Sequence, residues 1–288
     1  MFMVIAEAAL RQGLLLIPIA VGVYLSFRIL RFADLTPDGS ILIGGSACVV
    51  LLQSGCTPWC ALFGGAVAGA ATGCVTGLLS EYGGVDRVLA GLGTSMAAYT
   101  VALRVLGRGN VAITDSTDTI YSYLVNDIVI SCVICIFVLT IVTLLLKTRL
   151  GLVLRAVGEN SGLVSQLGGV PAFYRFAGLA FANALVGFGG GMLAQNQGFF
   201  DINQGVGTLF IGLAGVLIGM SLPFKDRPCF GPLVTALGTL IFALLTALAL
   251  RMGVFPGDIK FLTATLVIGA AWFARLSSRG RDAIPLIG

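Results

Sequence analysis

Residues 128–146 read IVISCVICIFVLTIVTLLL, a run of uncharged and mostly apolar residues. About 20 such residues are enough to span the hydrocarbon core of a bilayer as an α-helix. The whole chain has the same character, because 57% of its 288 residues are hydrophobic and only 10% are charged. A soluble domain carries about 25% charged residues. The sequence therefore predicts an all-α, polytopic membrane protein.

Apolar segments recur along the chain, and we expect each of them to form a helix. The second and the seventh are short and rich in glycine. We predict one transmembrane domain over residues 1–288, with about 8–10 membrane-spanning helices. The segments lie at residues 8–27, 39–53, 58–79, 88–106, 124–146, 174–195, 207–223, 230–250 and 259–275.

The basic residues predict the orientation, because cytoplasmic loops carry an excess of lysine and arginine. If every segment spans, twelve of the 17 basic residues fall on one side of the membrane. We predict that this side is cytoplasmic, with the C-terminus inside and the N-terminus outside. If the second segment is re-entrant, the first span inverts. The twelve are Arg28, Arg31, Arg87, Lys147, Arg149, Arg155, Arg175, Lys225, Arg227, Arg275, Arg279 and Arg281.

Two stretches of the sequence resemble each other and indicate an internal repeat. FADLTPDG at residues 32–39 leads into the second segment, and FFDINQG at residues 199–205 leads into the seventh. With the predicted orientation the two stretches approach opposite sides of the membrane, as in the inverted repeats of many transporters. We predict a first repeat at about 8–106 and a second at about 174–275; the alternative is a coincidence between two loop starts.

Glycine is unusually abundant, with 40 residues. A stripe of glycines spaced four apart in the third segment would let another helix backbone approach closely. Its role is either static packing, which is the commoner case, or the wall of a path. The sixth segment is interrupted by Gly187, Gly189, Gly190 and Gly191, which could unwind it where the freed backbone faces protein or water. The stripe consists of Gly65, Gly69, Gly73 and Gly77.

Several kinds of chemistry are excluded by residues that the sequence lacks. The chain has no histidine, which removes histidine-dependent triads and metal sites. No lysine follows a glycine in the Gly-Lys-Ser/Thr pattern of a P-loop. The basic residues form no nucleic-acid patch. We therefore predict a transmembrane path with no energy source, metal or cofactor of its own, and not an enzyme.

Two further features left alternatives open. Asp127 is the acid best placed inside a predicted span, so an ion-coupled carrier centred on it is an alternative. Cys56 and Cys60 flank a short connection and could form a disulfide if that loop faces an oxidising compartment.

The connection at about 147–172 has the character of a docking loop. Leu150, Val153, Leu154 and Val157 share one face of a predicted helix, which Gly158 can end. The loop contains the pattern Thr-Arg-x-Gly-x-x-x-Arg-Ala-x-Gly-Glu-Asn, followed by Leu-Gly-Gly-Val.

This pattern resembles the coupling-helix signature of ABC-importer permeases of the branched-chain amino acid, ribose and nucleoside type. Four further elements are similar to the tryptophan/tyrosine-type permeases of that superfamily. They are FRIL at residues 27–30, DLTPDGS at 34–40, LAG at 89–91 and RVLGRGNV at 104–111.

The resemblance implies a permease subunit in the bacterial inner membrane, working as a homodimer or a heterodimer. Two cytoplasmic ATPases, which would hold ATP and Mg²⁺, would bind the docking loop, and a periplasmic or lipid-anchored solute-binding protein would deliver the cargo. The implied cargo is an aromatic or branched-chain amino acid, with a nucleoside or a sugar as the alternative. The residues implied to couple to the ATPase are Arg149, Gly151, Arg155, Gly158, Glu159 and Asn160.

The charges of this loop could instead only anchor it at the lipid head groups. For the path, the candidates are the polar residues that precede the two short segments. They would contact cargo, or they would cap helices, as Asp and Ser ordinarily do. These candidates are Asp34, Thr36, Asp38, Gly39, Ser40, Asp201, Asn203 and Gln204.

Overall fold

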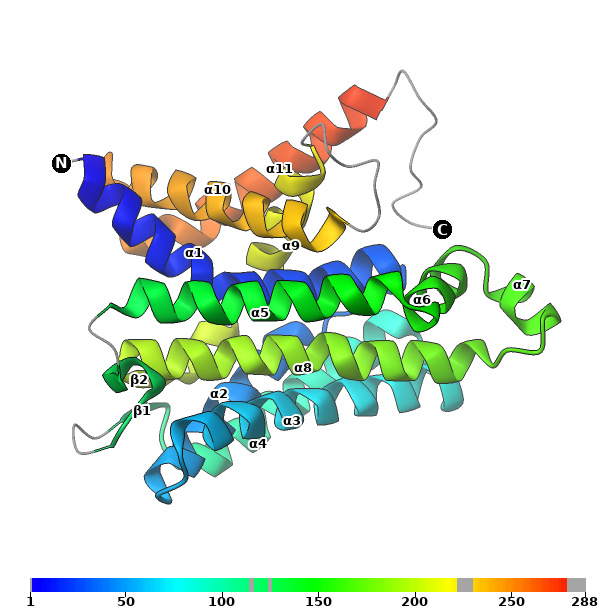
Figure 1. The fold of residues 1–288 in the computed structure, drawn as a ribbon, viewed down its shortest axis with the longest axis horizontal. Coiled ribbons are helices and arrows are strands. Elements are labelled where there is room, and N and C mark those ends of the chain that lie inside the picture. Colours follow the sequence, from blue (N-terminus) through cyan, green and yellow to red (C-terminus); the bar gives the residue numbers. More distant parts are fainter. Residues whose placement is uncertain (1, 114–116, 124–125, 222–229, 279–288) are drawn as a thin grey trace.

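The computed structural model describes residues 2–113, 117–123, 126–221 and 230–278, and it is almost entirely helical (Figure 1). Lys225, Arg227, Arg279 and Arg281, which contributed to the predicted orientation, lie outside the described residues. The helices are α1 (Phe2–Tyr24), α2 (Pro37–Gln53), α3 (Pro58–Gly77), α4 (Arg87–Leu106), α5 (Asp127–Lys147), α6 (Arg149–Glu159), α7 (Ser161–Gln166), α8 (Pro171–Gln197), α9 (Thr208–Met220), α10 (Gly231–Arg251) and α11 (Ile259–Ser278).

Each predicted apolar segment coincides with one of these helices. Among the described residues, seven helical stretches are long and apolar enough to cross a membrane; one of them, Ile202–Met220, consists of α9 and the helical turn before it, and α2, with 17 residues, is shorter. The prediction of an all-α, polytopic membrane protein is confirmed. Two helices end in a π-helical turn: α1 continues into η1 (Leu25–Ile29) and α3 into η2 (Leu78–Tyr82).

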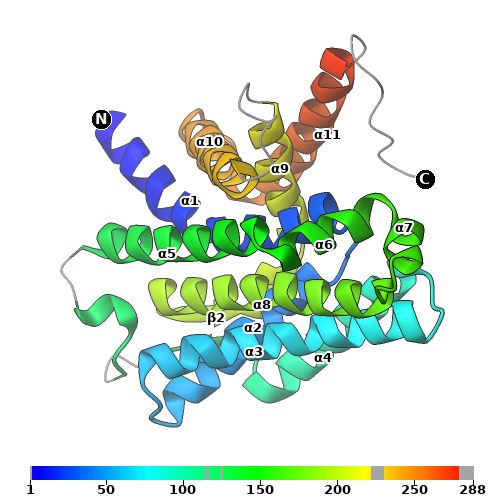
Figure 2. The same ribbon diagram turned by 45° about the vertical axis from the view of Figure 1, so that its right-hand side comes forward.

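The long helix α8 runs through the middle of the bundle, and α2 and α3 pack against it (Figures 1 and 2). The expectation that glycines 187–191 could unwind this helix is wrong, because α8 is continuous through them. A Cβ atom at Gly187, Gly189 or Gly190 would lie 2.5 Å from an atom of α3, α1 or α2, respectively. The glycines thus admit three neighbouring helices while the helical hydrogen bonds of α8 remain intact.

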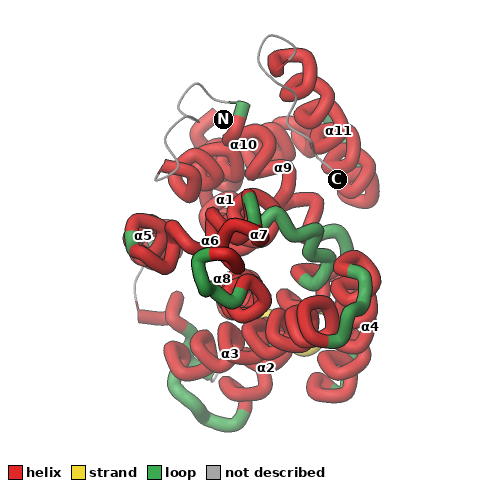
Figure 3. The backbone as a smooth tube through the Cα atoms, turned by 90° about the vertical axis from the view of Figure 1, so that its right-hand side faces the viewer, coloured by secondary structure: helices red, strands yellow, loops and turns green. Residues whose placement is uncertain are grey.

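The two ends of the molecule differ in structure. Helices α6 and α7 lie together at one end, which Figure 3 shows facing the viewer. At the opposite end, β1 (Asn110–Ala112) pairs antiparallel with β2 (Phe199–Asp201), with Val111 opposite Phe200. This small sheet joins the chain beyond α4 to the chain beyond α8. The predicted orientation makes the α6–α7 end cytoplasmic.

Candidate functional site

A cluster of polar side chains is buried where the short helix α2 begins against α3 and α8. Every member is at most 5% exposed. Three of them belong to the predicted path residues, and the other three, from α3 and α8, were not singled out from the sequence. We name this set the central polar cluster. It comprises Asp34, Thr36, Ser40, Thr72, Thr76 and Asn183.

Asn183 connects the Asp34 and Ser40 sides of the central polar cluster. Its Nδ2 donates to Oδ2 of Asp34 over 2.8 Å, and its Oδ1 accepts from the Ser40 hydroxyl over 2.6 Å. The Ser40 hydroxyl also lies 2.6 Å from that of Thr72. An amide side chain in the middle of a span needs such partners, since an unpaired buried polar group is costly.

Asp34 is held by donors rather than by a cation. Its Oδ1 accepts from the backbone N–H of Thr36 over 2.9 Å. The Thr36 hydroxyl lies 2.7 Å from that of Thr76 on α3. No ion pair found among the described residues involves Asp34. Hydrogen bonds from the chain therefore take over the role that water would have in solution.

Asp201 makes the same local turn as Asp34. Its Oδ1 accepts from the backbone N–H of Asn203 over 2.7 Å, again two residues on, and its Oδ2 accepts from Asn110 over 3.2 Å. Gln204 donates to Gln197 over 2.7 Å. These residues lie beside the small sheet rather than in the central polar cluster, so the structure places the predicted path residues in two groups.

Asp38 belongs to neither group and caps a helix other than its own. Its Oδ1 accepts from the backbone N–H of Leu209 over 2.7 Å, and its Oδ2 from that of Gly207 over 3.1 Å. Both donors are at the start of α9. The neighbouring Gly39 packs against α4, where a Cβ atom would lie 2.7 Å from Cα of Ser95. Contact of either group with cargo stays a prediction.

The glycine stripe of α3 lies along α8. A Cβ atom at Gly65 would lie 2.7 Å from the carbonyl oxygen of Gly44 on α2, and one at Gly77 would lie 3.0 Å from the ring of Phe176 on α8. Cβ atoms at Gly69 and Gly73 would also collide with the α8 backbone. In this structure the stripe is a packed helix–helix contact.

The docking loop forms two helices, α6 and α7, and each begins after a residue whose side chain caps it. Thr148 accepts from the backbone N–H of Gly151 at the start of α6, and Asn160 from that of Leu163 at the start of α7. Gly158 packs directly on the carbonyl oxygen of Ile29, with no room for a side chain. The close contact ties α6 to the π-helical end of α1.

The charged residues of this loop differ in their partners. Arg155 is half-buried and donates through Nη2 to the carbonyl oxygen of Leu146, over 2.7 Å, at the end of α5. Glu159 lies 3.7 Å from Arg31, and both are largely exposed. Arg149 is exposed. Arg155 therefore holds α6 to the bundle, whereas Arg149 and Glu159 face outward.

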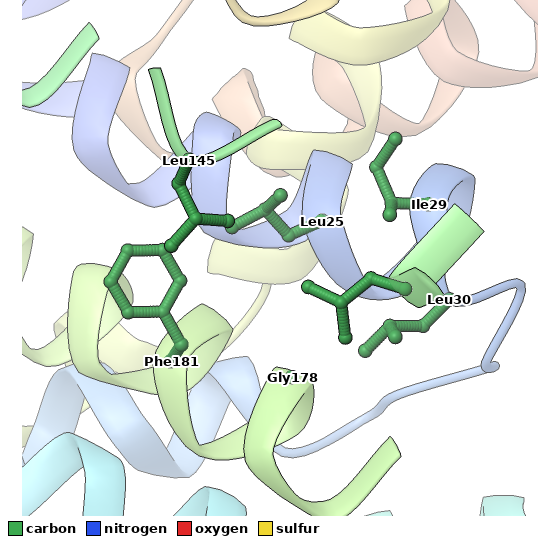
Figure 4. Close-up of a pocket in the computed structure, with 7 residues that line it drawn as sticks. Leu25, Ile29, Leu30, Leu145, Gly178 and Phe181 are labelled. Atoms are coloured by element: carbon green, nitrogen blue, oxygen red, sulfur yellow. The ribbon is translucent and has the colours of Figure 1, made fainter. Parts of the chain in front are cut away.

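Large apolar side chains of the docking loop are also exposed. Leu150 is 60% exposed, Leu152 68% and Leu167 79%. On the other side of α6, a small apolar pocket lies between this helix, η1, α5 and α8 (Figure 4). Its lining consists of Leu25, Ile29, Leu30, Leu145, Leu154, Gly178 and Phe181.

Two other predicted features have clear positions. Asp127 begins α5 and accepts from Arg11 of α1 over 2.9 Å, so its charge is paired. Cys56 and Cys60 are both exposed thiols, and no disulfide joins them in this structure.

Known proteins resemble the chain over nearly its whole length. The family described as the permease component of branched-chain amino acid transport systems matches residues 5–273. The tyrosine transport system permease protein of Clostridioides difficile is 30% identical over 91% of this chain and 88% of its own length. An uncharacterized protein of Rickettsia prowazekii is 31% identical over 95% of this chain and 97% of its own.

A third relative matches only part of the chain. The nucleoside ABC transporter permease protein NupC of Lactococcus lactis is 38% identical over 39% of this chain and 33% of its own length. No solved structure matches the chain. With the family match over residues 5–273 and seven apolar helices, the chain is an integral membrane protein that belongs to the branched-chain amino acid transport system permease family.

Proposed function

We propose that this permease forms the path of an ATP-driven importer for an amino acid, aromatic or branched-chain, and that α6 and α7 couple it to separate ATPase subunits. The observation that carries the proposal is the docking loop. Its apolar side chains are exposed at the end of the molecule where α6 and α7 lie. An apolar patch with a charged rim is typical of a surface that another protein covers.

The way α6 is attached supports a role in transmitting motion. Arg155 fixes it to the end of α5, and Gly158 fixes it to η1. A push on the exposed face of α6 would therefore reach two membrane helices directly.

The remaining parts of the proposal follow the same scheme. The α6–α7 end and the C-terminus are cytoplasmic, in the bacterial inner membrane, and ATP and Mg²⁺ bind to the ATPases. A periplasmic or lipid-anchored solute-binding protein delivers the cargo at the β1–β2 end, and a second permease copy, identical or not, completes the path. The matching turns at Asp34 and Asp201 support the proposed inverted repeat.

The cargo proposal rests on the relatives. The C. difficile relative, which covers most of this chain, is named a tyrosine permease. The partial match to a nucleoside permease favours a nucleoside as the second candidate. An ion-coupled carrier centred on Asp127 has less support, because that carboxylate lies at the start of α5 and is ion-paired with Arg11, which also pairs with Glu7.

The test is purification of the permease from its own cells, with a search for an ABC ATPase bound to it. We expect Leu152→Glu to remove the ATPase from the purified complex and to abolish ATP-dependent uptake into liposomes. Met252→Glu is the matched control, since this side chain is 87% exposed but lies beyond α10. Gradient-driven uptake by the permease alone, or unchanged ATPase binding by Leu152→Glu, would contradict the proposal.

The cargo is tested on the solute-binding protein that is proposed to deliver it. Thermal-shift measurements with tyrosine, leucine, a nucleoside and ribose should show stabilisation by an amino acid. Stabilisation by the nucleoside alone would replace the first candidate by the second.

A further inference from the structure

The two short helices of the bundle start next to each other. Helix α2 begins at Pro37 and has 17 residues, and α9 begins at Thr208 and has 13. A Cβ atom at Gly205, just before α9, would lie 2.7 Å from the carbonyl oxygen of Asp38. The N-termini of the two helices therefore adjoin in the folded chain although about 170 residues separate them.

Helix α9 has no cap of its own. Its N-cap residue is Gly207, at φ +90°, which has no side chain to accept from the first turn. The missing acceptor comes from α2, because Asp38 accepts from the backbone N–H groups of both Gly207 and Leu209. In a membrane protein these N–H groups could not be left unpaired without a large free-energy cost.

Asp38 also lies in the first turn of α2, the helix to which it belongs. A helix N-terminus carries roughly half a positive charge. The single carboxylate of Asp38 thus faces the positive ends of two helices at once. In several transporters, such helix ends inside the membrane bind the carboxylate of the cargo.

We propose that Asp38 is a built-in anion that joins α2 to α9 and fills the place between their N-termini. Two consequences follow. The short helices of the two halves are fastened to each other and shift as one unit. A cargo carboxylate does not bind at this position, because the carboxylate of the chain already occupies it. The tether itself does not depend on the proposed cargo.

The first test is hydrogen exchange of the purified permease in detergent. Asp38→Asn keeps the size of the side chain but removes its charge, and Asp38→Ala removes the acceptor. We expect the amides of residues 207–209 to exchange about tenfold faster in Asp38→Ala, the effect expected for the loss of a charged cap. The amides of α3 and α8 should keep their protection, so global unfolding is recognisable.

The second test is rescue by a small anion. Sodium formate should raise the melting temperature of Asp38→Ala by several degrees more than sodium chloride of equal concentration, and it should not do so for the wild type. Asp86→Ala is the matched control, because Asp86 caps its own helix α4 at an exposed position. This control should be less stable than the wild type without a specific response to formate.

The outcomes separate clearly. Unchanged exchange at residues 207–209 in both Asp38 variants would overturn the tether. An equal response to formate in Asp38→Ala, Asp86→Ala and the wild type would overturn the anion site. If Asp38→Ala shows the expected faster exchange and the expected response to formate but loses transport, the tether exists and the proposed path needs it. If transport persists in Asp38→Ala with the same cargo affinity, the cargo carboxylate binds elsewhere, as proposed.

Discussion

The contact between α3 and α8 predicts a large effect from adding one methyl group. In Gly187→Ala, the new Cβ atom would lie 2.5 Å from the carbonyl oxygen of Gly65 and 2.8 Å from Cα of Gly69. Ordinary contacts of a Cβ atom begin at 3.4 Å. The two helices would have to separate by about 0.9 Å, and both obstacles are backbone, so no side chain can turn away.

The magnitude follows from two opposing contributions. Overpacking in a filled interior lowers the free energy of unfolding by about 1–3 kcal/mol. We expect a loss near the upper end of this range, because the obstacle is the backbone of α3, which cannot turn away. Alanine is the better helix former by about 1 kcal/mol, which offsets part of the loss. We expect the free energy of unfolding to fall by about 2 kcal/mol.

The assay is equilibrium unfolding of the purified permease in mixed micelles, with sodium dodecyl sulfate as denaturant and circular dichroism as the signal. Gly93→Ala in α4 is the matched control, because no atom lies within 4 Å of the position of its Cβ. It should leave the stability unchanged or raise it by up to about 1 kcal/mol. Equal stability of Gly187→Ala and Gly93→Ala would refute the reasoning.

Other substitutions test the polar contacts and the docking loop. Asn183→Ala should lower the free energy of unfolding in the same assay by about 2–4 kcal/mol, because it removes the hydrogen-bond partner of the buried side chains of Asp34 and Ser40. Wild-type stability of this variant would show that Asp34 and Ser40 find other partners. Glu81→Gln breaks a mostly buried ion pair with Arg175 (3.2 Å) and should lower the free energy of unfolding by about 3–5 kcal/mol. Glu7→Gln, which breaks the exposed pair of Glu7 with Arg11, should lower it by less than about 1 kcal/mol; similar losses in the two variants would argue against the burial effect. Gly158→Ala should push α6 off Ile29 and abolish ATP-dependent uptake while the protein level stays normal; full uptake would contradict coupling through this contact.

The helices could be predicted from the sequence because hydrophobicity in a membrane protein is a local property. Each of the nine apolar segments is a helix, and the boundaries of α3 and α4 agree within a few residues. The glycine run of α8 gave the wrong expectation. Glycine at 187–191 favours unwinding only if nothing packs beside it, and the neighbouring helices α1, α2 and α3 are not visible from the local sequence.

The polar contacts were harder to predict because their partners lie far apart in the chain. Asn183, inside an otherwise apolar span, was a signal that could have been noticed. Thr72 and Thr76, spaced four apart beside the glycine stripe, were a weaker one. The role of Asp38 could not be predicted, because an acid at the start of one helix ordinarily caps that same helix.

The pairing of β1 with β2 has a consequence for how the protein is made. Asn110 emerges from the ribosome 91 residues before its partner Asp201. At about 5–20 residues per second, β1 has no strand to pair with for about 5–18 s. Helices α5 and α8 must be threaded through the membrane during this interval. The β1–β2 pair can therefore close only after α8 has been synthesised, and a chain that stalls after α5 would leave β1 as an unpaired strand.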